Sequence, residues 1–287
     1  MALRLLIPKG RIYDSIARLL NEAGFPIRSA ERTYRPALGV EWLDAKIMKP
    51  QNVGELLEIG SHDAGFTGID WIQESGAQVE EVLDLGFDRV RIVAAIPSEE
   101  DEQQLKKRKI VVATEYVRLA ENYLKTNGYD YRIVRTYGAT EVFPPDDADM
   151  IIDNTASGQT LRENGLKIIA TLLTSSTRFF ASRQALACAG KRQQIDELGM
   201  LFRAVLEGRG RVMLEMNAGA ADYERLIAAV PAMRFPTVMP LHSGGGAAAG
   251  YAIKIAVQRT EVPELLPRLK QLGATDIVEY DLRKVMP

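Results

Sequence analysis

Short apolar segments alternate with helical segments along most of the chain, and this alternation constrains the fold more than any other feature. Residues 3–7 are mostly apolar and predict a buried strand, after which Ile12, Ile16 and Leu19 recur at helical spacing up to Gly24. Further strands are predicted at 45–48, 64–68, 90–96, 110–113, 131–134 and 150–152, with helices near 53–57 and over 117–126. Buried strands alternating with helices are typical of a mainly parallel sheet covered on both faces. We therefore expect two α/β lobes with a cleft between them.

The pattern changes after Gly208. Strands are predicted at 211–215, 238–239, 251–257 and 276–280, and helices at 223–230 and 262–272. This βαββαβ order is that of a ferredoxin-like unit, so we expect a separate C-terminal module. A run of glycine and alanine at 244–250 interrupts it.

Cysteine and histidine are too scarce for several kinds of chemistry. The single cysteine, Cys188, cannot form an internal disulfide or a Cys-rich zinc site. Its alanine-rich surroundings predict a buried small side chain, and a reducing cytoplasm suits it. His62 and His242 lie far apart and belong to no H-E-x-x-H pattern, so imidazole-based zinc catalysis is disfavoured and both are expected to be ordinary loop residues.

Charge and hydropathy exclude two further classes. The formal net charge is −2, which argues against a protein that relies on general attraction to nucleic-acid backbones, although a local basic pocket is compatible with it. The N-terminus is apolar only briefly before Lys9 and Arg11, and no later run approaches the roughly 18 apolar residues of a membrane helix. We expect a cytoplasmic protein without membrane or nucleic-acid partners.

The most informative segment begins where the strand at 150–152 ends. Asp153 is followed by small residues as far as Gly158, and a helix is expected to begin near Gln159 or Thr160. Small residues let the backbone approach a ligand, and successive N–H groups at the start of a helix bind phosphate without a cationic side chain. Ser157 and Thr160 add hydroxyl donors to such a phosphate site.

Carboxylates flank this segment, and a structural interpretation competes with the functional one. Asp149 and Asp153 could meet the hydroxyls of a diol or a hydrated magnesium ion. Alternatively, the segment is a strand-to-helix turn with Thr155 or Ser157 as its N-cap. Loop composition alone leaves both interpretations open.

A family resemblance favours the phosphate site. Residues 153–166 resemble the phosphoribosyl-diphosphate loop of ATP phosphoribosyltransferase, the first enzyme of histidine biosynthesis. Segments at 8–11 (Pro-Lys-Gly-Arg), 63–70, 137–141 and 234–237 match the family in the same order. The C-terminal module is similar to the ACT-like regulatory domain of the long form of that enzyme.

The resemblance implies a fold and a domain layout. We expect a two-lobed core of the type II periplasmic-binding-protein kind and a C-terminal ferredoxin-like (ACT-like) domain. The first catalytic lobe is expected to be discontinuous, comprising 1–88 and 178–210, because the strand at 177–182 and the helix at 195–206 return to it. The second lobe would comprise 89–177 and the regulatory domain 211–287.

The resemblance also implies a reaction and its residues. The phosphoribosyl group of 5-phosphoribosyl 1-diphosphate would move to N1 of ATP, releasing diphosphate, with magnesium present. Lys9, Glu141 and Asp153 are the implied catalytic residues, and Arg11 would join Lys9 in contacting phosphates. The implied loop contacts are Asp153, Thr155, Ala156, Ser157, Gly158, Gln159 and Thr160. Lys49, Gly68 and Asp70 would bind the nucleotide, and magnesium would lie near Asp149 and Asp153 through the substrate.

Departures from the family and alternative functions complete the expectation. Lys49 stands where arginine is common, which keeps the charge but loses the bidentate fork, and Ser157 replaces threonine with its hydroxyl retained. A homo-oligomer, from dimer to hexamer, with histidine as allosteric inhibitor is implied, although the run at 244–250 leaves the histidine site open. The alternatives are a non-enzymatic small-molecule receptor and an inactive regulatory paralogue on the same scaffold.

Overall fold

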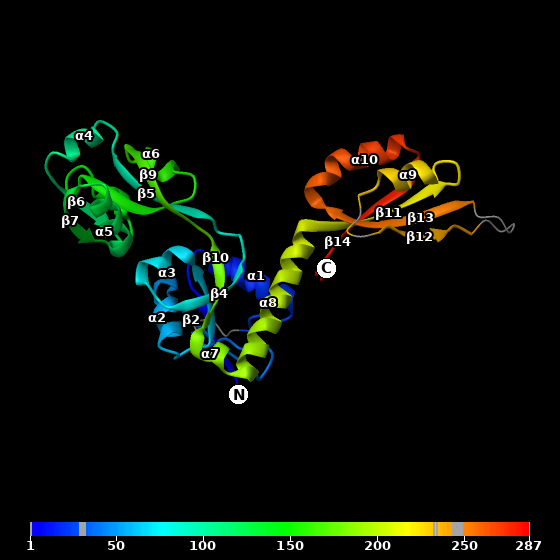
Figure 1. Ribbon diagram of the computed structural model, residues 1–287, viewed down its shortest axis with the longest axis horizontal. Helices are drawn as coiled ribbons and strands as arrows, with labels where there is room; N and C mark the ends of the chain where they lie inside the picture. The colour runs from blue at the N-terminus through cyan, green and yellow to red at the C-terminus, as the bar shows by residue number, and fades with distance from the viewer. Residues whose placement is uncertain (1, 29–32, 232, 234, 243–248, 287) are drawn as a thin grey trace. The chain divides into compact units, whose positions relative to one another are not determined.

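The computed structural model describes residues 2–28, 33–231, 233, 235–242 and 249–286 (Figure 1). They form two compact units, Met1–Gly199 and Met200–Pro287. The first unit contains two five-stranded sheets, and the second contains one four-stranded sheet. No helix in the described parts of the chain combines the length and apolar character needed to cross a membrane.

The first sheet, with its helices, is called the first lobe below. In sheet order its strands are β2 (Leu43–Met48), β1 (Leu3–Pro8), β3 (Ala64–Gly68), β10 (Thr177–Ser182) and β4 (Val79–Asp84). Its helical segments are α1 (Tyr13–Ala23), η1 (Pro50–Asn52), α2 (Val53–Glu58), α3 (Ile69–Ser75) and α7 (Arg183–Ala187). All five residues of β3 are buried, as expected of a strand covered on both faces.

The second sheet, with its helices, is called the second lobe. Its strands, in sheet order, are β7 (Asp130–Arg135), β6 (Lys109–Thr114), β8 (Met150–Thr155), β5 (Val90–Pro97) and β9 (Leu166–Ser175). Its helical segments are α4 (Glu102–Leu105), α5 (Val117–Thr126), η2 (Thr140–Val142) and α6 (Gln159–Glu163). The charged stretch at 99–109 thus contains the short helix α4 between two strands.

The two lobes share one topology, which corrects the expectation of mainly parallel sheets. In each sheet two strand pairs are parallel and two are antiparallel. The antiparallel pairs arise because a strand that follows a chain crossing between the lobes is inserted into the sheet and runs opposite to both of its neighbours. The inserted strands are β10 in the first lobe and β5 in the second. The chain crosses between the sheets twice, from β4 to β5 and from β9 to β10. This order is that of the type II periplasmic-binding-protein fold.

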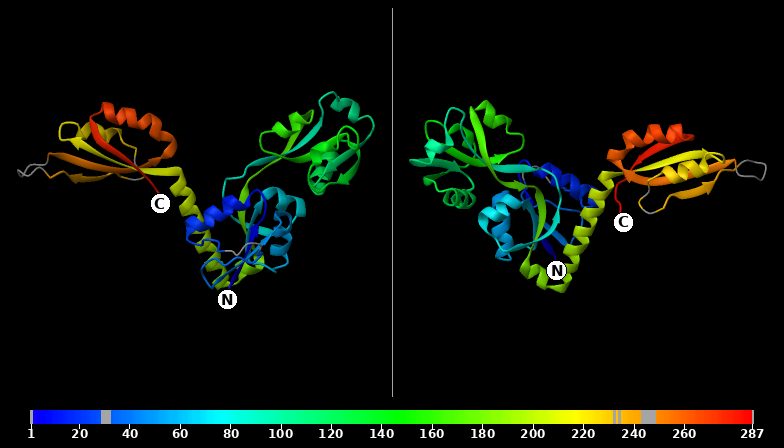
Figure 2. Two further views of the ribbon diagram at one scale, coloured as in Figure 1. Left: turned by 180° about the vertical axis from the view of Figure 1, so that it is seen from behind. Right: turned by 45° about the horizontal axis from the view of Figure 1, so that its top comes forward.

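The second unit is a ferredoxin-like module. Its antiparallel sheet has the order β12 (Thr237–Pro240), β13 (Gly250–Gln258), β11 (Arg211–Gly219) and β14 (Ala274–Asp281). Its helical segments are α9 (Tyr223–Ala229), η3 (Arg259–Glu261) and α10 (Val262–Gln271). Figure 2 shows α9 and α10 on one face of this sheet, where Leu226, Leu265 and Leu269 complete a buried core. Most of the predicted small-residue run and Arg234 lie outside the described residues.

Two local expectations differ from the structure. The helix expected at 195–206 is longer, because α8 spans Ala189–Gly210, and its last turns pack beside the C-terminal segment, where Val285 N donates to Ala204 O. Cys188, expected to be buried, is exposed. It lies in the turn between α7 and α8, so its alanine neighbours reflect helix propensity and not a core.

A buried carboxylate ties the start of the first lobe together. The Asp63 side chain is 3% exposed and accepts hydrogen bonds from the backbone and guanidinium of Arg4 and from Lys191 Nζ at 2.7 Å. Burial alone would raise the pKa of Asp63, but the hydrogen bonds from Arg4 and Lys191 outweigh it and hold that pKa below its ordinary value.

Replacement of Asp63 by alanine is expected to destabilise the first unit by about 3 to 5 kcal/mol at pH 7, because it leaves Lys191 without its buried partner. Since the folded pKa of Asp63 is lowered, this stability is present above the unfolded pKa of 3.8 and is lost as pH falls below it. Urea unfolding measures the change. The exposed pair Arg35–Asp44 supplies the control, and Asp44→Ala is expected to cost less than about 1 kcal/mol. Equal losses for the two variants would contradict the assignment.

Candidate functional site

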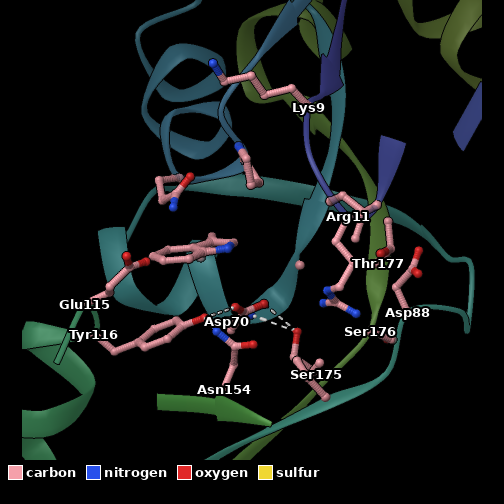
Figure 3. A pocket seen from close by; sticks show the side chains of 16 residues that line it. Lys9, Arg11, Asp70, Asp88, Glu115, Tyr116, Asn154, Ser175, Ser176 and Thr177 are labelled. Carbon is pink, nitrogen blue, oxygen red and sulfur yellow. Dashed lines mark hydrogen bonds between the residues drawn. The ribbon is translucent and has the colours of Figure 1, made fainter. Parts of the chain in front are cut away.

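A cavity of about 180 Å³ lies between the two lobes. Its walls come from strand ends and from both chain crossings, as expected for ligand sites at the carboxyl ends of strands. The lining residues used below are Lys9, Arg11, Gly68, Asp70, Trp71, Tyr116, Asn154 and Ser175 (Figure 3). We call it the first cavity.

A second cavity of about 270 Å³ adjoins the first. Arg11, Val90 and Asn154 line both cavities. Its other walls are Glu141, Asp153 and the segment that follows β8. The predicted cationic residues and the predicted carboxylates therefore come together around two connected spaces.

The segment after β8 forms a loop that its own side chains hold in shape. Gly158 has a φ of 75°, a left-handed conformation that favours glycine, and Thr155 Oγ1 accepts a hydrogen bond from its N–H at 2.9 Å. Ser157 Oγ accepts from Gln159 N at 3.3 Å, and Arg162 donates to Ser157 O. Helix α6 begins at Gln159 as expected, but its N-cap is Gly158 and not Thr155 or Ser157.

The members of this loop differ in their exposure to the second cavity. Thr155, Ala156, Ser157, Gln159 and Thr160 line it, whereas Gly158 is buried and makes the turn. Thr155 and Ser157, the two residues predicted as N-caps, do accept hydrogen bonds from backbone N–H groups, but neither occupies the N-cap position of α6. Apart from the buried Thr155, the small and polar loop residues that line the second cavity are exposed.

Asp153 lies in β8 beside this loop. Burial raises the pKa of its carboxyl to about 6, and the carboxylates of Glu115 and Glu141 add to the rise, while hydrogen bonds from Asn154 and Thr140 oppose it. Groups with strongly shifted pKa values cluster at functional sites, so the raised pKa makes Asp153 a candidate functional residue. Glu141 lines the same cavity from η2, which follows Ala139 in a left-handed conformation with a φ of 49°.

Lys9 and Arg11 follow β1 directly and are both exposed. Lys9 N donates to Met48 O, which fixes the turn, and Lys9 Nζ lies 5.8 Å from the centre of the Tyr34 ring. Both side chains line the first cavity, and Arg11 reaches the second as well. They place two positive charges on a wall that Asp70, Asp88 and Glu115 also line.

The first lobe contributes a buried carboxylate to the wall of the first cavity. Asp70 is 4% exposed, and its two oxygens accept hydrogen bonds from Tyr116 Oη at 2.9 Å and Ser175 Oγ at 2.5 Å. Gly68 permits this arrangement, because a Cβ at that position would overlap Asp70 Oδ1. The side chain of Asp70 is therefore committed to protein partners in this structure, while Gly68 brings backbone to the cavity wall.

The two lobes contact each other where α3 meets the start of α5. Trp71 stacks on Tyr116, with ring centres 4.5 Å apart and an interplanar angle of 20°. Glu74 accepts hydrogen bonds from the backbone N–H groups of Arg118 and Leu119, each at 3.0 Å. Tyr116 occupies the N-cap position of α5, but its side chain accepts no hydrogen bond from the first turn. The Glu74 carboxylate of the other lobe caps the helix instead.

Four residues singled out from the sequence do not join these cavities. Asp149 precedes β8 at the opposite end from the loop, and its carboxylate binds Arg108 at 2.7 Å and the N–H of Val111. Lys49 stands next to Pro50, which lines the first cavity, but is not itself among the lining residues. His62 contacts Ser61, and His242 is exposed in the described part of the C-terminal module.

Three wall residues were not predicted from the sequence: Tyr116, Asn154 and Ser175. Tyr116 follows β6, a parallel strand, and the rule that ligands bind at the carboxyl ends of such strands could have identified it. Ser175 ends β9 at a crossing between lobes, a position that carried no signal before the topology was known.

Fold and site together define a class of protein. They define a two-lobed α/β protein with a cleft between its lobes, in which a hydroxyl-bearing loop after a buried strand adjoins cationic and acidic side chains; this combination is typical of sites for phosphorylated small molecules.

Comparisons with known proteins identify the family. The ATP phosphoribosyltransferase family model matches residues 49–204, and the model described as HisG, C-terminal domain, matches residues 208–284. The ATP phosphoribosyltransferase of Chlorobium phaeovibrioides is 36% identical over 290 residues, covering 99% of this chain and 97% of that one. That of Pelotomaculum thermopropionicum is 34% identical and covers both chains fully. The chain belongs to the ATP phosphoribosyltransferase family and has the two parts of its long form.

A solved structure agrees on the fold. The ATP phosphoribosyl transferase (HisG:HisZ) complex from Thermotoga maritima has a chain with a TM-score of 0.63 to this one, at 23% identity. The match covers 70% of this chain and 98% of that one.

Replacement of Asp153 by asparagine is expected to stabilise the first unit above pH 6 by about 1 to 3 kcal/mol. The pKa of Asp153 is about 6 in the folded protein and 3.8 for an ordinary aspartate. The stability that the protonated carboxyl contributes is therefore fully present below pH 3.8 and is lost as pH rises to 6. Asparagine avoids that loss. Urea unfolding between pH 4 and pH 8, followed through Trp42 and Trp71, should show a difference that grows up to pH 6 and then levels. A constant difference would contradict the raised pKa.

Proposed function

We propose that the chain transfers the 5-phosphoribosyl group of 5-phosphoribosyl 1-diphosphate to N1 of the adenine of ATP, releasing diphosphate. One observation carries the proposal: Arg11 and Asn154 line both cavities, so the space that Lys9 and Arg11 line adjoins the loop and carboxylates of the second cavity. Two anionic substrates could therefore meet at this junction. The names of the relatives and the family resemblance support the same assignment.

The residues suit this chemistry. N1 of adenine is a neutral nucleophile that carries no proton, so the reaction needs no general base. The barrier lies in the departure of diphosphate and in the positive charge that develops on the ribose. We assign the 5′-phosphate to the loop from Thr155 to Thr160 and the ribose to Asp153 and Glu141, where negative charge favours a cation-like ring.

Lys9 and Arg11 would hold the departing diphosphate or the triphosphate of ATP. Both cations lie on the first lobe, opposite the phosphate loop of the second lobe. Substrates bound in this way would be anchored at both ends with the reacting carbon between them. Positioning and electrostatic stabilisation would then provide the rate enhancement.

Magnesium fits this site as part of the substrate. In the described residues no group of three or more His, Cys, Asp or Glu side chains is arranged to hold a metal ion. Asp153 and Glu141 offer hard oxygen donors on one cavity wall, and Mg²⁺ is commonly bound by one or two carboxylates together with substrate phosphates. We assign Mg²⁺ to these two residues and not to Asp149, whose carboxylate is paired with Arg108. When bound, the ion would neutralise charge on the diphosphate.

The decisive assay mixes the purified protein with ATP, phosphoribosyl diphosphate and Mg²⁺ and measures phosphoribosyl-ATP by mass spectrometry. Product is expected with the wild type, and Asp153→Ala is expected to reduce kcat by roughly 100-fold or more because it removes the charge beside the ribose. Omission of Mg²⁺ should also suppress turnover. Binding of substrates without product would favour a receptor or an inactive paralogue, and unchanged turnover in Asp153→Ala would refute the assigned site.

We propose that histidine, the end product of the pathway, inhibits the enzyme through the C-terminal ferredoxin-like module and that the chain works as a homo-oligomer. The module's separate core and its family match support a regulatory role. Sedimentation velocity is expected to show dimers that shift toward hexamers when histidine is added, and calorimetry should detect histidine binding to the full chain. Sedimentation as a monomer under all conditions would overturn the assembly, and the absence of a binding signal would overturn the inhibitor.

A further inference from the structure

A continuous chain of hydrogen bonds joins the two cavities. Ser175 Oγ donates to Asp70 Oδ1 at 2.5 Å, and Tyr116 Oη donates to Asp70 Oδ2 at 2.9 Å. Asn154 Nδ2 donates to Tyr116 Oη at 3.2 Å and to Asp153 Oδ1 at 3.1 Å. These hydrogen bonds run from Ser175, at a crossing between the lobes, through the buried carboxylate of Asp70 to Tyr116 and Asn154 (Figure 3). From Asn154 they continue to Asp153 in the second cavity.

The donor and the acceptor of each hydrogen bond in this network can be assigned from the chemistry of the groups. A carboxylate at Asp70 can only accept, so the Tyr116 hydroxyl must donate its single proton there. Burial and the neighbouring Asp70 charge raise the pKa of Tyr116 far above its ordinary value, which keeps that proton in place. The Tyr116 oxygen is then left as an acceptor. Asn154 must turn its amide N–H₂ toward it, and the second amide hydrogen reaches Asp153.

The middle of this hydrogen-bond chain is buried, whereas its end at Asn154 is exposed. Tyr116 is 1% exposed and stacks on Trp71, so its hydroxyl cannot move without disturbing the contact between lobes. Asn154 is exposed and lines both cavities. Asp153 Oδ1 accepts from the Asn154 backbone N–H at 2.7 Å, and the Asn154 amide adds a second contact to the same oxygen. Without the Tyr116 oxygen, this second contact would lose the group that orients the amide. The buried part of the chain therefore orients the exposed part.

We propose that Tyr116 and Asn154 are positioning residues that hold the Asp153 carboxylate in its reactive orientation toward the ribose. The inference rests on the proposed function, because it concerns the carboxylate assigned there. It also links the contact between the lobes to the second cavity. The Tyr116 hydroxyl donates to Asp70 of the first lobe and accepts from Asn154, which in turn contacts Asp153.

Steady-state kinetics of Tyr116→Phe tests the proposal. This variant keeps the ring that stacks on Trp71 and removes only the hydroxyl. We expect kcat to fall roughly tenfold while the KM values for ATP and phosphoribosyl diphosphate stay within about twofold, because orientation of Asp153 matters most in the transition state. Asn154→Ala should give the same division between kcat and KM. An unchanged kcat in both variants, or an effect confined to KM, would overturn the proposal.

A double-mutant cycle separates positioning from a general structural role. If Tyr116 acts through Asp153, then Tyr116→Phe should lower the single-turnover rate much less in an Asp153→Asn background than in the wild type. Equal fold-changes in the two backgrounds would mean that the hydroxyl acts independently of Asp153 and would refute the proposal.

Tyr129→Phe is the matched control. Tyr129 is buried in the same lobe, and its hydroxyl donates to the Glu102 carboxylate at 2.9 Å, away from both cavities. It should leave kcat unchanged, and a tenfold loss there would show that any buried hydroxyl in this lobe matters. Thermal unfolding checks that each variant is folded, and Asn154→Ala carries the test if Tyr116→Phe does not fold. A wild type that forms no product would overturn the proposed function, whereas an active wild type with unaffected variants overturns this inference alone.

Discussion

The contact between α3 and the start of α5 joins the two lobes beside the first cavity. It combines three interactions of different kinds: a stacked aromatic pair, a hydrogen bond to a buried carboxylate, and a carboxylate that caps the helix of the other lobe. Each is short-ranged, so together they tolerate little change in the separation of the lobes. The first cavity borders this contact, and residues of the contact form part of its wall.

The local elements could be predicted because their causes are local. Apolar periodicity located α5 at Val117–Thr126, and Gly24 ends α1 in the left-handed conformation that glycine favours. The βαββαβ order of the second unit was equally visible, since each element buries one face against its neighbours in sequence. The loop after β8 was recognised for the same reason: its small residues, hydroxyls and carboxylate are adjacent along the chain.

The rest depends on partners that are distant in sequence. Tyr116 and Asp70 are separated by 46 residues, and nothing near either residue announces the bond between them. The antiparallel half of each sheet was missed because strand direction depends on where the chain crosses between the lobes, whereas buried apolar strands have the same composition in either direction. Cys188 was misplaced because alanine-rich sequence is common to cores and to exposed helices.

The position of β10 has a consequence for the order in which the protein can fold during synthesis. β10 lies between β3 and β4 in the first sheet, so β4 has no neighbour until Thr177–Ser182 has left the ribosome. The second sheet, in contrast, is built from the continuous stretch between β5 and β9. The later lobe can therefore complete its sheet first, and the lobe that begins the chain must wait for β10 with β3 as an open sheet edge and β4 unpaired.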